Sequence, residues 1–79
     1  MQLLTGRQCR MARALLQWTE PELAKAAKVS LYAVRKIEAN DGLANIKAGD
    51  LQLLYDAFIN TGKIQFESGG VIPLESSDQ

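Results

Sequence analysis

Apolar residues recur at helical spacing through the first part of the chain. Thr5 stands three residues before Gln8, a capping-box pattern that marks the start of a helix. The apolar positions that follow are three or four residues apart, as on one face of a helix. We therefore expect a first helix over about residues 6–17. Its buried face is expected to hold Cys9, Ala12, Leu15 and Leu16.

Two short helices are predicted next, separated by a tight turn. Thr19 and Glu22 form a second capping box, and Pro21 suits a first helical turn, so a helix is expected over about 20–27. Residues 28–30 are the turn, and Ser30 is expected to cap a helix over about 31–39. The residues expected in the core are Leu23, Ala24, Val34 and Ile37, and those expected to face mostly outward are Leu31, Tyr32, Arg35 and Lys36.

A loop over residues 40–47 precedes a fourth predicted helix, over about 48–60, with Gly62 placed to end it. Its expected core stripe is Leu51, Leu54, Tyr55 and Phe58. In the last segment the spacing of apolar residues changes to every second residue, which is typical of strands. Two strand-like runs separated by Ser68-Gly69-Gly70 predict a β-hairpin within residues 63–75, with Pro73 confined to an edge or bulge. We thus expect a helical domain over 1–62, a hairpin over 63–75, and a disordered tail over 76–79.

The hairpin is too apolar to be an idle tail, and an isolated two-stranded hairpin is marginal in water. Two interpretations remain open. It covers the helices of its own chain, or it pairs strands with a second copy and makes a dimer. We favour dimerisation. The residues expected to carry it are Ile64, Phe66, Val71 and Leu74.

Composition excludes several classes of protein. The 79 residues suffice for one small domain, and the single Cys9 allows no internal disulfide, which fits a reducing cytoplasm. No histidine is present, so we expect no metal site and no reactive Cys9 thiol. No membrane span, signal peptide, catalytic constellation or phosphate loop is evident. We expect a cytoplasmic protein that is not an enzyme, with no cofactor and no small-molecule ligand.

Charge is unevenly distributed although the net charge is zero. Residues 1–36 hold seven basic and two acidic residues, and the rest holds two basic and seven acidic residues. A neutral domain can therefore present one basic face, as nucleic-acid binding requires. Arg7, Arg10 and Arg13 form a stripe along the first predicted helix, which is either a solvated face or an edge that meets phosphate.

The segment QCRMARALLQWTEPELAKAAKVSLYAVRKIEA resembles the helix-turn-helix of phage repressors, the Cro/xenobiotic-response-element class. It is most similar to small bacterial regulators with a QCR-x-AR-x-LL-x-W opening and a strand-rich Gly-Gly-Val tail, here residues 66–74. The resemblance covers residues 7–74. It implies a mainly α, four- to five-helix repressor-like domain followed by a short C-terminal β-hairpin. It also implies a structural ion pair between Arg13 and Glu38.

The resemblance implies a recognition helix over about 31–39 and assigns contacts to double-stranded DNA. The residues matching the base-contacting positions are Leu31, Tyr32, Arg35 and Lys36. The residues expected at phosphates are Thr19, Lys28, Ser30, Arg7 and Arg10. Several positions depart from the family pattern. Glu20 replaces a common amide, Lys28 replaces the glycine of the turn, and the loop over 40–45 lacks the usual basic residues.

These features favour a homodimeric, sequence-specific transcriptional regulator that acts as a repressor at an inverted-repeat operator and associates with the bacterial nucleoid when bound. A first alternative is a protein that has lost DNA binding and acts as an antiactivator or antitoxin-like partner, docking Leu31 and Tyr32 into another regulatory protein. A second is an architectural or recombination-directionality DNA factor.

Overall fold

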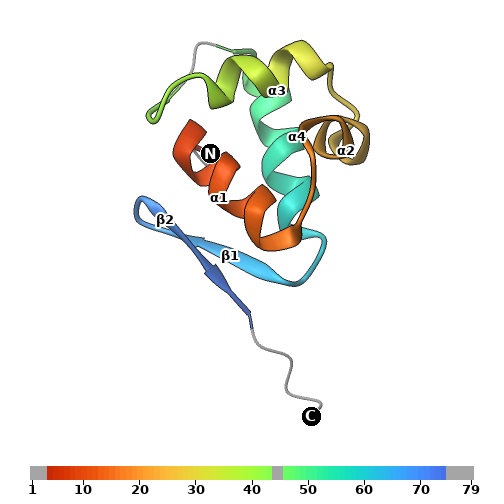
Figure 1. Cartoon of the computed structure of the whole chain (residues 1–79). Helices are drawn as coiled ribbons and strands as arrows, with labels where there is room; N and C mark the ends of the chain where they lie inside the picture. The colour runs from red at the N-terminus through yellow and green to blue at the C-terminus, as the bar shows by residue number, and fades with distance from the viewer. Residues whose placement is uncertain (1–3, 44–45, 75–79) are drawn as a thin grey trace.

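A computed structural model describes residues 4–43 and 46–74 of the chain. These residues form four helices, α1 (Gly6–Leu16), α2 (Glu20–Ala27), α3 (Leu31–Glu38) and α4 (Ala48–Ile59), followed by the strands β1 (Ile64–Glu67) and β2 (Gly70–Pro73) (Figure 1). The protein is therefore mainly helical with a C-terminal antiparallel hairpin. Every predicted helix boundary lies within one residue of the observed one. The tail expected over 76–79 lies outside the described residues.

The helix starts follow from the predicted capping residues. The Thr5 hydroxyl accepts from the Gln8 amide, and Gln8 accepts in return from the Thr5 amide at 3.1 Å. Thr19 and Glu22 form the same reciprocal pair at α2. The Ser30 Oγ accepts from the Ala33 amide at 3.0 Å and so caps α3.

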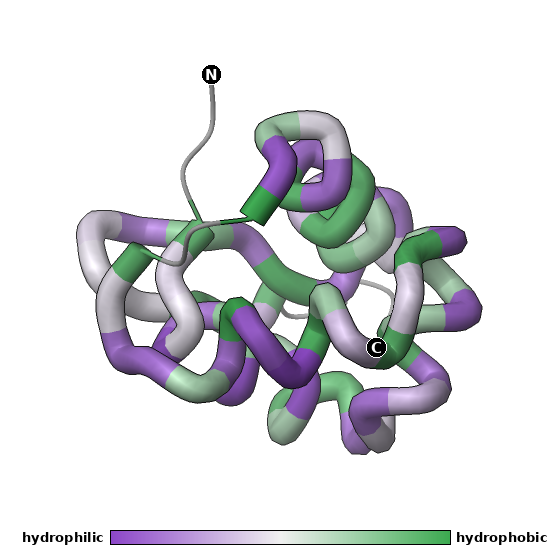
Figure 2. The backbone as a smooth tube through the Cα atoms, turned by 90° about the horizontal axis from the view of Figure 1, so that it is seen from above, coloured by the Kyte–Doolittle hydropathy of each residue, from purple (hydrophilic) through white to green (hydrophobic). Residues whose placement is uncertain are grey.

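The core lies where the four helices and the hairpin meet, and polar and apolar stretches alternate along the helices (Figure 2). Its largest fully buried side chains are Phe58, Leu4, Leu23, Ile37, Leu54, Val34 and Cys9. Trp18 stacks on Phe58 with ring centroids 5.9 Å apart. Two expectations were wrong. Leu15 is exposed, because it lies at the edge of the helix face that buries Cys9 and Ala12. Leu31 is half-buried against the core instead of facing outward.

Gly6 allows α1 to meet the end of α3 at close range. A Cβ at this position would lie 1.8 Å from the carbonyl oxygen of Asn40 and 2.2 Å from that of Ile37. The gap is closed by backbone hydrogen bonds, because the amides of Gly6 and Arg7 donate to the carbonyls of Gly42 and Asp41 at 2.9 and 3.2 Å. The chain after α3 thus satisfies N–H groups that the start of α1 leaves free.

The hairpin covers α1 and α4 of its own chain. β1 and β2 pair with Ile64 opposite Pro73 and Phe66 opposite Val71, across a two-residue turn with Gly69 at φ 77°. Phe66 packs on Phe58 and Tyr55, with centroids 5.8 and 5.3 Å apart. Gln8 holds the turn, because its Nε2 donates to the carbonyls of Glu67 and Gly70 at 2.9 and 3.1 Å.

The four residues expected to join two copies differ in how far they are buried. Ile64 is 2% exposed, so its side chain is not available to a second copy, whereas Phe66 and Val71 are half-buried against the core of their own chain. The Leu74 amide donates to the Lys63 carbonyl at 2.7 Å. Antiparallel alternation then points Pro73 toward the outer edge of β2, where it has no N–H to donate. Pro73 therefore opposes strand pairing at the outer edge of β2, and of the four residues Leu74 is the one left exposed.

Candidate nucleic-acid interface

The turn between α2 and α3 fixes the angle at which α3 is presented. Lys28 adopts a left-handed conformation, φ 61° and ψ 41°. In that conformation its amide donates to Lys25 at 3.3 Å, and the Val29 amide donates to the Ala24 carbonyl at 3.1 Å. Glycine adopts this backbone without strain, whereas a side chain there costs roughly 1 kcal/mol. Lys28, which replaces the glycine of the family pattern, therefore adopts a backbone conformation that glycine would adopt at lower cost.

The outer face of α3 presents Tyr32, Arg35 and Lys36. Tyr32 is 71% exposed, and the Nζ of Lys36 lies 5.8 Å from the centroid of its ring, one helical turn away. The ammonium group and the ring can attract each other at this distance. Leu31, the fourth residue expected to meet bases, is half-buried and is less available than the other three.

An open pocket of about 360 Å³ lies between α3 and the start of α4. Tyr32 and Lys36 line one side, and Ile46, Lys47 and Asp50 line the other, with Ser30 at the edge. Lys47 was missed by the sequence analysis. It is the N-cap residue of α4 and makes no side-chain cap. A basic residue directly before a predicted helix was the signal that could have identified it, because the positive end of a helix favours anions.

The basic stripe of α1 is engaged within the chain. Arg10 donates through Nη1 to the carbonyls of Glu38 and Asn40 at 2.7 and 3.2 Å and forms an ion pair with Asp41. Arg7 lies 3.5 Å from the same Asp41 carboxylate. The hydrogen bond from Arg10, with both arginine charges, holds the pKa of Asp41 below its usual value. Arg10 is thus committed to the end of α3, whereas the Arg7 side chain, 60% exposed, lies on a solvated surface beside Asp41.

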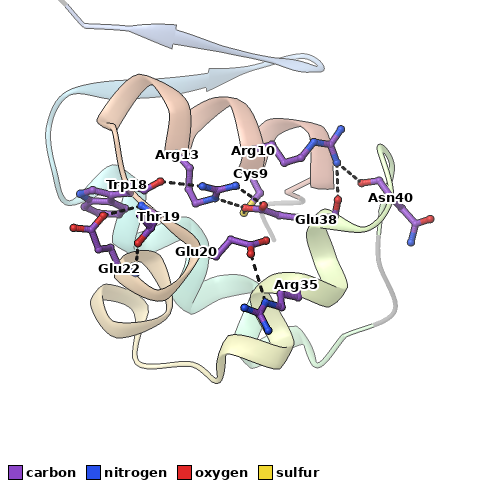
Figure 3. Close-up of polar contacts among 10 residues, drawn as sticks. All are labelled: Cys9, Arg10, Arg13, Trp18, Thr19, Glu20, Glu22, Arg35, Glu38 and Asn40. Atoms are coloured by element: carbon purple, nitrogen blue, oxygen red, sulfur yellow. Dashed lines mark hydrogen bonds and ion pairs between the residues drawn. The ribbon is translucent and has the colours of Figure 1, made fainter.

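The ion pair expected between Arg13 and Glu38 is present and joins α1 to the end of α3 (Figure 3). Arg13 Nε and Nη2 donate to the two Glu38 oxygens at 2.7 and 2.8 Å, and Nη1 donates to the Trp18 carbonyl at 2.9 Å. Burial opposes the charge of Glu38. Hydrogen bonds from Arg13 and Cys9, with the Arg13 charge, outweigh it, so the pKa of Glu38 is lowered.

Cys9 takes part in the same cluster as a protonated thiol. Its Sγ donates to Glu38 Oε2 at 3.2 Å. Burial, and then the neighbouring Glu38 carboxylate, raise the pKa of the thiol far above its usual value. Cys9 is therefore a buried structural residue, without the electropositive and accessible setting of a reactive cysteine.

At the start of α2, side chains are held by neighbours within the chain. The Thr19 amide donates to Glu22 at 2.7 Å, so this N–H is not available to a phosphate, and the Thr19 hydroxyl, which accepts from the Glu22 amide, can still donate its hydrogen. Glu20 lies on the other side of the helix start, with Oε1 3.5 Å from Nε of Arg35 on α3. Figure 3 shows the Glu20 side chain between the Arg13–Glu38 pair and Arg35.

The lysines supply the cations that are not paired. Every arginine forms an intramolecular ion pair. No lysine does so within residues 4–43 and 46–74. Lys25, Lys28, Lys36 and Lys47 belong to α2, the turn, α3 and the start of α4, and Lys63 belongs to the hairpin region. Exposed positive charge that is free to meet an anion is thus concentrated around α2 and α3.

Other kinds of site are not evident in the described part of the chain. No three His, Cys, Asp or Glu side chains there are placed to hold a metal ion. No helix among these residues is long and apolar enough to cross a membrane. Comparison with known protein families, with curated proteins and with solved structures finds no match in any of the three.

Proposed function

We propose that the protein is a sequence-specific DNA-binding transcriptional regulator of the helix-turn-helix type, acting as a repressor on an inverted-repeat operator. The observation that carries the proposal is the exposed face of α3. It joins an aromatic hydroxyl, Tyr32, to a free ammonium group, Lys36, and further unpaired lysines flank it on α2, on the turn and at α4.

In this proposal α3 enters the major groove and α2 crosses the backbone. Lys36 reaches the O6 and N7 acceptors of guanine. Tyr32 packs on a sugar or donates its hydroxyl to phosphate. Lys28 precedes α3 in the chain, and Lys47 lies across the pocket from Tyr32 and Lys36. In the complex both lysines contact phosphates, and the Ser30 hydroxyl donates to a further phosphate oxygen. Repression then requires no more than occupancy of a promoter.

A two-fold operator requires two copies of the chain, with recognition helices about 34 Å apart. Because Pro73 removes an N–H donor from the outer edge of β2, we place the contact between copies on exposed apolar side chains. Met11 and Leu15 lie on α1, and Ile72 and Leu74 lie on the outer face of β2, which packs beside α1. The double variant Ile72→Thr with Leu74→Gln should be monomeric by light scattering. Leu53→Gln, a change at a similarly exposed leucine of α4, should remain dimeric. A double variant that stays dimeric would reject this placement.

Selection of genomic DNA fragments by the purified protein at two salt concentrations tests the function. We expect one inverted repeat to be enriched. If four lysines per protomer neutralise phosphates, the affinity of a dimer should fall by about four orders of magnitude between about 50 and 200 mM salt.

Variants of the exposed face of α3, with a control elsewhere, test whether this face carries the binding. Lys36→Ala and Tyr32→Ala should lose the enriched repeat, whereas Lys63→Ala, which removes an unpaired lysine of the hairpin region, should keep it. Absence of enrichment at low salt, from a protein shown to be folded by circular dichroism, would sink the proposal.

A second candidate function is a protein-binding module that keeps the scaffold without DNA. The observation in its favour is the exposure of Tyr32 beside the pocket that contains Ile46, together with the capture of all four arginines inside the chain. Exposed aromatic residues next to charged ones are typical of binding hot spots. If the DNA selection fails, Tyr32→Ala becomes the first variant to compare with the wild type in a pull-down.

A further inference from the structure

Within residues 4–43 and 46–74, Glu20 is the one carboxylate that forms an ion pair with a cation of the exposed face of α3. Its Oε1 lies 3.5 Å from Nε of Arg35, whose side chain is 63% exposed, while the Glu20 side chain is 31% exposed. The three arginines of α1 bind the end of α3 and the residues after it. Arg35 is held instead by the first residue of α2 (Figure 3).

We propose that Glu20 competes with DNA phosphate for Arg35 and thereby sets the affinity of the interface. The inference rests on the proposed function. In the free protein Glu20 draws the Arg35 guanidinium toward α2. When DNA binds, a phosphate oxygen must replace the Glu20 carboxylate as the partner of Arg35.

The geometry suits an exchangeable contact. An exposed ion pair contributes little to stability, so releasing Arg35 disturbs the fold far less than breaking the buried Arg13–Glu38 pair would. The two parallel N–H donors of a guanidinium can bind either a carboxylate or a phosphate, so Arg35 can exchange one for the other.

Glu20 acts in a second way, through the helix it begins. It occupies the first turn of α2, where the free N–H groups and the helix dipole favour an anion. A carboxylate there occupies the position in which a backbone phosphate would otherwise be stabilised. Both effects lower affinity, and both are removed by an uncharged side chain of the same shape.

Glu20→Gln is the test, with Glu22→Gln as its matched control. Both changes remove one negative charge from the same helical turn. Glu22 bonds to Thr19 and not to an arginine of α3, and glutamine can keep that cap. The probe is a labelled mixed-sequence DNA duplex of about 24 base pairs, long enough for two half-sites, and affinity is measured by fluorescence anisotropy at several salt concentrations.

We expect Glu20→Gln to raise affinity by about threefold per bound protomer, hence by about tenfold for a dimer that carries the change twice. The slope of log affinity against log salt should stay close to that of the wild type, because Arg35 contacts a phosphate in both complexes. Glu22→Gln should change the affinity less and leave the slope unaltered.

A double-mutant cycle with Arg35→Gln separates capture of Arg35 from simple repulsion. If Glu20 acts by holding Arg35, Glu20→Gln should raise affinity in the wild-type background and far less in the Arg35→Gln background. Equal gains in both backgrounds, or equal gains from Glu20→Gln and Glu22→Gln, would overturn the inference while leaving DNA binding intact. If the folded wild type and every variant fail to bind duplex at low salt, the proposed function itself fails, and this role for Glu20 fails with it.

Discussion

Replacing Glu38 by glutamine should cost the protein about 3 kcal/mol of folding free energy. The carboxylate is 4% exposed and its partner, the Arg13 side chain, is 21% exposed. Removing one member of a buried pair costs about 3–5 kcal/mol, because the other charge is left without a counter-ion. The lower end applies here, since Arg13 keeps its bond to the Trp18 carbonyl and some contact with water.

This loss is a large fraction of the total free energy of unfolding. A chain of this length has a stability of roughly 4–12 kcal/mol, and each kcal/mol corresponds to about 4–8 °C in Tm. Glu38→Gln should therefore melt about 15 °C below the wild type when followed by far-ultraviolet circular dichroism near neutral pH. Glu22→Gln, at an exposed acid, is the control and should melt within about 3 °C of the wild type.

The difference between wild type and Glu38→Gln should also depend on pH. Because the pKa of Glu38 in the folded protein lies below its ordinary value of 4.5, the stabilisation is fully present above that value. It is lost as the pH falls through the lower folded pKa, where the carboxyl takes up a proton. The two melting curves should thus converge in acid. A loss below about 0.5 kcal/mol at neutral pH, or a gap that persists at pH 2, would refute the view that a charged, buried pair ties α1 to α3.

Three further outcomes follow from the backbone and from the core. Gly6→Ala should unfold at lower denaturant concentration, because a Cβ at that position would lie 1.8 Å from the Asn40 carbonyl oxygen; a chemical melt equal to that of the wild type would contradict the close approach. Gln17→Gly and Lys28→Gly should each add about 0.5–1 kcal/mol in urea titrations, since both residues have positive φ, 59° and 61°. Lys28→Gly should in addition weaken DNA binding. A loss of stability in both glycine variants would contradict the view that positive φ strains these two residues. The Cys9 thiol, whose pKa is raised by burial, should react with a disulfide reagent only after unfolding in urea, and rapid labelling of the native protein would contradict its place in the core.

The helices could be predicted because local signals specify them. Threonine and serine caps, Pro21 in a first turn, and apolar residues three and four apart each act within one or two turns. The hairpin was equally local, since Gly69 in a left-handed turn joins two short runs of strand-forming residues. Inward positions such as Ala24, Val34 and Phe58 followed from the same periodicity.

The partners of the charged side chains could not be predicted from the sequence, because those partners lie on other helices. The spacing of Arg7, Arg10 and Arg13 shows that they share one side of a helix, but not what that side meets. The contacts of these arginines depend on Gly6, because it lets the residues after α3 approach the start of α1. Asn40 and Asp41 then lie within reach of the arginine side chains.

The hairpin shows the same division. Its alternation could be read from the chain, whereas its packing over the helices of the same chain could not. That packing depended on whether α1 and α4 leave apolar contacts for Ile64 and Phe66, and on Gln8 reaching the hairpin turn from 59 positions away along the chain.

By itself, the sequence determined the secondary structure and the set of residues available to each helix face, because capping and periodicity act over a few residues. Tertiary structure alone decided which cations remain free. Arginines that meet carboxylates and carbonyls across helices are engaged, and lysines around α2 and α3 are left exposed. The physical reason is that ion pairs act over a few ångströms in space, and the distance between two charges is set by how the helices pack.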